Sequence, residues 1–67
     1  MDIQDLIEEF ETLKQQHVGI ALTHKIILSN SQTEPCAKKE AEREFNRAIG
    51  FITALNLVIC ELEKIAE

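Results

Sequence analysis

Two long stretches of the sequence place apolar side chains every three or four residues, and a single polar segment separates them. Such spacing puts side chains on one face of an α-helix packed along its length. No alternating pattern typical of a β-strand competes with it, so the chain is expected to be all-helical. The positions predicted to form the contact face of the first helix are Ile3, Leu6, Phe10, Leu13, His17, Ile20, His24 and Ile27.

The second stretch repeats this pattern and widens it. Its expected contact positions are Ala41, Phe45, Ala48, Ile52, Leu55, Ile59, Leu62 and Ala66. Further apolar residues lie beside each face, namely Ile7, Ala21 and Leu28 in the first stretch and Phe51, Val58 and Ile65 in the second. An apolar face covering three of every seven positions suits a helix with two neighbours, as in a four-helix bundle.

The polar segment around residues 30–33 holds the turn-forming residues and is followed by the only proline, Pro35. We expect a helix over about residues 2–29, a turn at 30–33 and a helix over about 34–66, folded as an antiparallel hairpin in one domain. Thr33 is the preferred N-cap of the second helix, because it leaves Pro35 in the first turn. Ser31, with Glu34 closing a capping box, is the alternative. Folding at this turn places His17 near Phe45 and Ala48.

The hairpin is expected to need a second copy. At 67 residues one core rarely supplies more than about 3–5 kcal/mol. Cys36 and Cys60 lie about 36 Å apart if they share a helix, so they cannot form an internal disulfide. More apolar residues are also present than two helices can cover. Those predicted to lie off the contact face are Val18, Leu22 and Ile26, an i, i+4, i+8 row, together with Ile49 and Leu57.

Charge favours an antiparallel homodimer. The formal net charge is −5, and residues 2–11 carry five acids and no base. The turn end carries five bases, although four glutamates are mixed in; the bases are Lys25, Lys38, Lys39, Arg43 and Arg47. Two hairpins packed in opposite directions set the acidic end of one against the more basic end of the other.

No catalytic, cofactor or metal site is predicted. His17 and His24 share a helix face, but an i, i+7 spacing separates them by about 10 Å, too far to share one ion. We interpret both as structural, hydrogen-bonded to neighbours such as Gln16, Thr23 or the facing helix. Cys36 is a candidate redox-sensitive thiol or cross-dimer link, but no base is placed to activate it, and a helix-start role is favoured. Cys60 resembles buried filler.

Two surfaces are candidates for contact with a partner. The first is the apolar row Val18, Leu22 and Ile26, together with the acidic residues Asp5, Glu8 and Glu9. The second is a basic ridge formed by Lys39, Arg43 and Arg47. Interleaved glutamates supply ion-pair partners for this ridge, such as Lys38–Glu42 and Glu40–Arg43, and no aromatic residue is placed to stack on bases. We therefore interpret the ridge as a solvated face.

These features predict a small, non-enzymatic protein–protein interaction module, acting as a regulator, adaptor or inhibitor in the form of a helical-bundle homodimer. The alternative is a nucleic-acid-associated regulator that binds DNA or RNA through the basic ridge. In architecture alone, the expected dimer resembles small plasmid-encoded hairpin dimers that bind RNA. The N-terminal residues lack a signal-peptide pattern and no apolar stretch approaches about 20 residues, so a cytoplasmic location is expected.

Overall fold

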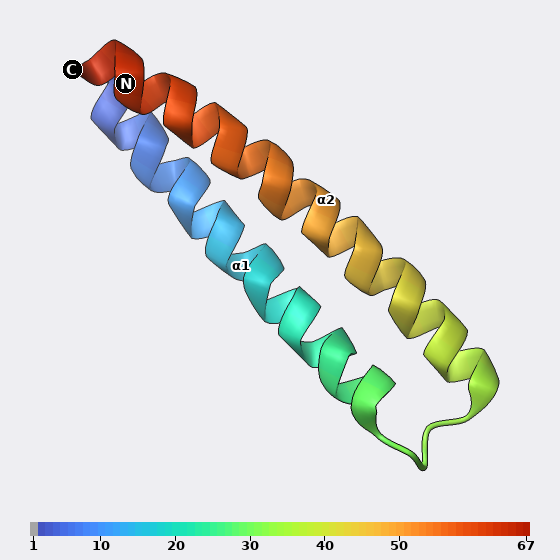
Figure 1. Cartoon of the computed structure of the whole chain (residues 1–67). Helices are drawn as coiled ribbons and strands as arrows, with labels where there is room; N and C mark the ends of the chain where they lie inside the picture. The colour runs from blue at the N-terminus through green and yellow to red at the C-terminus, as the bar shows by residue number, and fades with distance from the viewer. Residues whose placement is uncertain (1) are drawn as a thin grey trace.

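The computed structural model describes residues 2–67, which form two helices folded into a hairpin. Helix α1 covers Ile3–Ser29 and helix α2 covers Pro35–Ala66. The helices run antiparallel, with the two ends of the chain at one end of the molecule and the turn at the other (Figure 1). The predicted all-helical hairpin is therefore confirmed. Neither helix in the described part combines the length and apolarity that crossing a membrane requires.

Helix α1 begins at a side-chain cap. Asp2 has extended backbone angles, and its Oδ1 accepts a hydrogen bond of 2.9 Å from the amide of Asp5. The carboxylate thereby satisfies one of the amides that the first turn leaves without a helical partner. Its negative charge also lies at the positive end of the helix dipole. The aspartate at the start of the sequence thus fixes where α1 begins.

The turn corrects the predicted cap of α2. Thr33 does not cap α2, because its hydroxyl donates to the carbonyl of Ile27 at 3.0 Å and so satisfies a carbonyl at the end of α1. The N-cap of α2 is Glu34, whose side chain makes no capping hydrogen bond. Pro35 occupies the first turn, as predicted, where its missing N–H leaves no bond unmade.

The contact between the helices follows a strict heptad pattern, which we call the contact seam. Its buried members are Ile7 and Ala21 of α1 and Ala41, Ala48, Leu55 and Ile59 of α2. Half-buried residues at the intervening seven-residue repeats complete it, namely Ile3, Phe10, Lys14, His17, His24 and Leu28 of α1 and Lys38, Phe45, Ile52 and Leu62 of α2. The seam of α2 is the one predicted from Ala41 to Leu62, but Ala66, predicted as its last member, is exposed, and Lys38 lies in the seam without having been predicted. The seam of α1 also differs from the prediction.

In α1 one of the two predicted heptad rows is correct and the other is displaced by one position, so that residues 7, 14, 21 and 28 take the place expected for residues 6, 13, 20 and 27. Leu13 and Ile20 were expected in the contact but are 39% and 43% exposed, whereas Ala21 is buried. Lys14 takes the place expected for Leu13 and is half-buried. Small residues on the seam, such as Ala21 and Ala48, let two helices approach closely, and the aliphatic stem of a lysine can cover such a contact while its ammonium stays in water.

The hairpin is a rod with a thin core. It measures 49 × 15 × 14 Å, and its radius of gyration is 15.3 Å, against about 11 Å for a compact domain of this length. Within residues 2–67, three of the six buried residues are alanines, and no side chain is completely buried. The apolar area hidden between the two helices is therefore small for a chain of 67 residues.

Candidate interaction surface

The displaced row of the α1 seam leaves an apolar face along one side of the hairpin, which we call the open flank. It consists of one heptad row from each helix, Leu6, Leu13, Ile20 and Ile27 of α1 and Glu44, Phe51, Val58 and Ile65 of α2. Seven of these eight residues are apolar. Leu6, Ile27 and Glu44 are half-buried, and the other five are exposed, with Ile65 at 64%.

The two rows of the open flank lie on the same side of the molecule. The rings of His17 and Phe51 pack across the helices with their centroids 4.7 Å apart and their planes inclined by 38°. A small hollow beside this pair is lined by residues of both rows, Ile20 of α1 and Glu44 of α2 among them. The rows therefore form one continuous face, with the His17–Phe51 pair near its middle.

The opposite side of the hairpin has the contrasting character. Its two heptad rows are Gln4, Glu11, Val18 and Lys25 of α1 and Glu42, Ile49, Asn56 and Glu63 of α2. Only Val18 and Ile49 are apolar, and Val18 is half-buried. The hairpin therefore has one apolar and one polar flank.

The predicted apolar row on the back of α1 is divided by the structure. Leu22 and Ile26 are 56% and 70% exposed, and both line a shallow hollow near the turn with Lys25 and Asn30. Val18, one turn before Leu22, is half-buried and belongs to the polar flank. The exposed part of this row is therefore the pair Leu22 and Ile26. Ile49 and Leu57 are exposed as predicted, with Leu57 at 65%.

The predicted acidic residues lie beside the open flank. Asp5, Glu8 and Glu9 are all exposed, and together with Phe10 and Leu13 they line a shallow hollow on α1 near the chain ends. Acidic and apolar side chains therefore meet at this end of the molecule.

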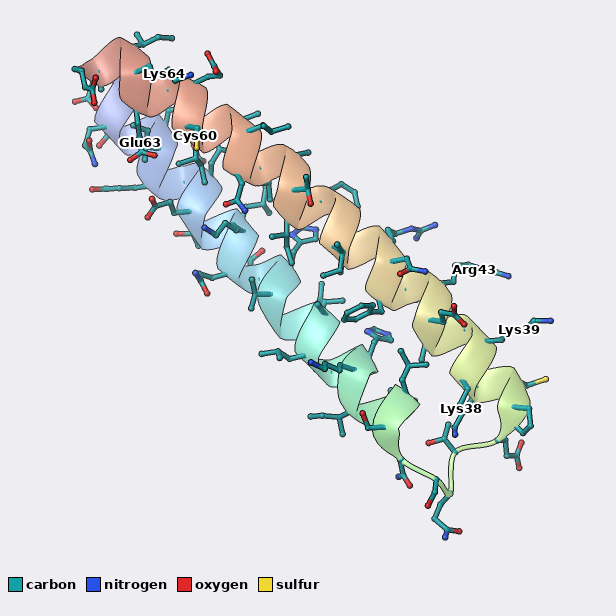
Figure 2. All side chains as sticks on the ribbon, in the orientation of Figure 1. Lys38, Lys39, Arg43, Cys60, Glu63 and Lys64 are labelled. Carbon is teal, nitrogen blue, oxygen red and sulfur yellow. The ribbon has the colours of Figure 1, made fainter. Side chains whose placement is uncertain are left out.

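The basic ridge is less regular than predicted. Lys39 and Arg43 project from α2 away from α1 (Figure 2). Arg47 lies 3.7 Å from the carboxylate of Glu44, in an exposed i, i+3 ion pair. The predicted pairs Lys38–Glu42 and Glu40–Arg43 are not formed; the other ion pair within residues 2–67 joins Lys64 to Glu61 at 3.2 Å. Two cations of the ridge thus remain directed into solvent.

Both histidines are held by their own helix. Nδ1 of His17 lies 2.9 Å from the carbonyl oxygen of Leu13, and Nδ1 of His24 lies 2.8 Å from that of Ile20. Since a carbonyl oxygen only accepts, each Nδ1 carries the proton and donates it. The partners are thus backbone carbonyls one turn earlier, not the side chains predicted. In the described residues no three His, Cys, Asp or Glu side chains come together in a group suited to a metal ion.

The cysteines are both free and exposed. Cys36 lies in the first turn of α2, directly after Pro35, as the sequence predicted. Cys60 was expected to be buried, and that expectation is wrong. It follows the seam residue Ile59 by one position, which turns its side chain outward.

The open flank was missed as a separate surface because its rows were divided between two predictions. Leu6, Leu13, Ile20 and Ile27 were assigned to the contact between the helices, and Phe51, Val58 and Ile65 to its edge. The signal that was available is the neighbouring row of α1, which is apolar at Ile7, Ala21 and Leu28 and interrupted only by Lys14, so that it could also face α2.

None of the protein families, curated proteins or solved structures compared with the chain matches it.

Proposed function

We propose that the protein is a cytoplasmic, non-enzymatic interaction module that works as a homodimeric helical bundle. The observation that supports this most directly is that more large apolar side chains are exposed than are buried between the two helices. In the part of the chain that the structure describes, six residues are buried, three of them alanine, whereas nine large apolar side chains are exposed. At this size a single core rarely supplies more than about 3–5 kcal/mol, and oligomerisation is one of the usual ways to add to it.

The accessible surface supports the same proposal. The chain exposes 5111 Å². A compact monomer of 7.6 kDa exposes about 4,300 Å². The excess is close to the roughly 800 Å² that each partner contributes to a standard protein–protein interface. Covering one flank of the hairpin with a second copy would bring the accessible surface of each chain close to that of a compact monomer of the same mass.

The module acts on its target as a regulator, adaptor or inhibitor, through surfaces that the dimer leaves open. Leu22 and Ile26 are suited to this role because they are exposed and lie away from both the contact seam and the open flank. The acidic residues Asp5, Glu8 and Glu9 add an electrostatic component, which accelerates association with a basic partner. Apolar anchors with charged neighbours are the usual composition of such interfaces.

Sedimentation at decreasing concentration, with circular dichroism on the same samples, tests the proposal. We expect a dimer that loses helicity as it dissociates, because the isolated hairpin is marginal. A fully helical monomer at nanomolar concentration would remove the basis of the proposal. The target-binding role is tested by affinity capture with Leu22→Asp, which is expected to remain a folded dimer and to lose the proteins captured by the unchanged chain.

A further inference from the structure

We infer that the second copy binds the open flank in the opposite direction, so that α1 of one chain lies against α1 of the other and the His17–Phe51 pairs meet near the twofold axis. This inference rests on the proposed homodimer and specifies its face and its orientation. Of the nine large apolar side chains exposed in residues 2–67, five lie on the open flank, namely Leu13, Ile20, Phe51, Val58 and Ile65.

The spacing of the α1 row fits an inverted copy. Leu6, Leu13, Ile20 and Ile27 repeat every seven residues, and the middle of this row falls between Leu13 and Ile20. The middle of α1 itself, which covers Ile3–Ser29, falls at residue 16. An antiparallel copy centred there sets Leu13 against Ile20 of the partner and Leu6 against Ile27 of the partner. Each isologous contact of this kind occurs twice, as twofold symmetry requires.

The α2 row agrees at the same point along the rod. The middle of α2, which covers Pro35–Ala66, falls beside Gly50 and Phe51. The Phe51 ring is half exposed although it already packs on His17. In the inverted dimer this ring lies beside its counterpart from the second copy. An aromatic pair at the centre of the interface would bury the largest exposed side chain of the flank.

Charge selects this orientation over the parallel one. The half of the hairpin nearer the chain ends, residues 2–16 and 51–67, carries eight acids and two bases, a formal charge of −6. The half nearer the turn, residues 17–50, carries five bases and four acids, a formal charge of +1. A parallel dimer stacks the two −6 ends on each other. The antiparallel dimer sets each −6 end against a +1 end and avoids that repulsion.

Cysteine cross-linking distinguishes the two orientations. Gln16 is exposed, and it borders the same hollow as the flank residue Leu13. With antiparallel helices 8–10 Å apart and a Cα radius of about 2.3 Å, Cα atoms that face each other lie roughly 3.4–5.4 Å apart, so the two copies of residue 16 come close enough for a disulfide. In a parallel dimer through the same flank, α1 of one copy faces α2 of the other and the two α1 helices lie diagonally across the bundle. The two copies of residue 16 are then too far apart to form a disulfide.

The experiment uses the full chain with Cys36→Ser and Cys60→Ser, so that one introduced thiol is present. Gln16→Cys is expected to form a covalent dimer in a glutathione redox buffer. Gln15→Cys is the matched control, since Gln15 is also exposed but borders a different hollow of α1, lined by Glu11 and Lys14. A dimer by sedimentation that leaves Gln16→Cys no more cross-linked than Gln15→Cys overturns the orientation while the homodimer stands. A helical monomer in both overturns the inference and the homodimer together.

Flank substitutions give an independent measurement. Ile20→Asp is expected to raise the dimer dissociation constant on the order of 100-fold, because the added carboxylate is buried at two symmetric places. Leu22→Asp, two residues along and more exposed, is expected to change it by less than about threefold. Equal effects of the two changes would contradict the assignment of the flank. If Ile20→Asp is unfolded at every concentration, the cross-linking comparison decides the matter.

Discussion

Truncation of three nearby residues of α2 tests both the contact seam and the proposed dimer in one experiment. Leu55 lies in the contact seam and is 8% exposed, whereas Leu57, two residues later, is 65% exposed. Val58 lies on the open flank and is 41% exposed in the single hairpin. All three lie within one helix and are truncated to alanine, so differences in helix propensity between the variants are small.

The expected losses follow from burial. Leu55→Ala removes about three buried methylene equivalents, about 2.4 kcal/mol by transfer, and a cavity term brings the loss to about 3 kcal/mol per chain. Leu57→Ala removes atoms that are already in water and is expected to cost less than about 0.5 kcal/mol. Val58→Ala is expected to cost about 1 kcal/mol if the hairpin stands alone and about 1.5 kcal/mol if a second copy covers the flank.

Urea unfolding followed by circular dichroism measures all three variants. The protein concentration must be the same in each titration, because dimer formation makes apparent stability depend on it. With a slope near 1 kcal/mol/M, typical of a small protein, Leu55→Ala is expected to lower the midpoint by at least about 2 M. A loss for Leu57→Ala as large as that for Leu55→Ala would refute the reasoning, because it would mean that the side described as exposed is covered. Tolerance of Leu55→Ala would show that the contact seam is wrongly placed.

Three further predictions concern the helices and the basic ridge. Gly19→Ala and Gly50→Ala are each expected to stabilise the protein by about 0.5–1 kcal/mol, seen as a higher thermal midpoint, because an added Cβ at either position meets nothing within 4 Å. A loss of stability instead would indicate that another helix approaches there. Glu34→Asn supplies the side-chain cap that α2 lacks and is expected to raise the thermal midpoint by about 4–8 °C, for about 1 kcal/mol; an unchanged midpoint would mean that the turn prevents the new side chain from reaching the helix amides. The unchanged chain is expected to bind neither DNA nor RNA in low-salt filter binding, owing to its net charge of −5. Salt-sensitive retention that disappears in Lys39→Glu/Arg43→Glu would favour the nucleic-acid alternative instead.

Most of the architecture could be predicted because it depends on short-range signals. The three-four periodicity, the single polar turn and Pro35 leave few folds other than an antiparallel helical hairpin. The predictions that were wrong concern features that depend on tertiary contacts. Thr33 was expected to bond an amide at the start of α2, but its hydroxyl donates instead to the carbonyl of Ile27 at the end of α1. Cys60 follows a buried residue directly, and one helical position separates burial from exposure.

The displaced row of the α1 seam has a different cause. When three adjacent heptad rows are apolar, each neighbouring pair of rows shows a three-four spacing, so periodicity alone cannot say which pair faces the other helix. Leu13 favours one pair and Ala21 the other, and Lys14 breaks the second row once. A helix with a single neighbour needs one such pair; a helix with two neighbours needs both. The ambiguity in α1 is thus what a bundle helix produces, and the row that the hairpin leaves exposed is the row that the second copy is proposed to cover.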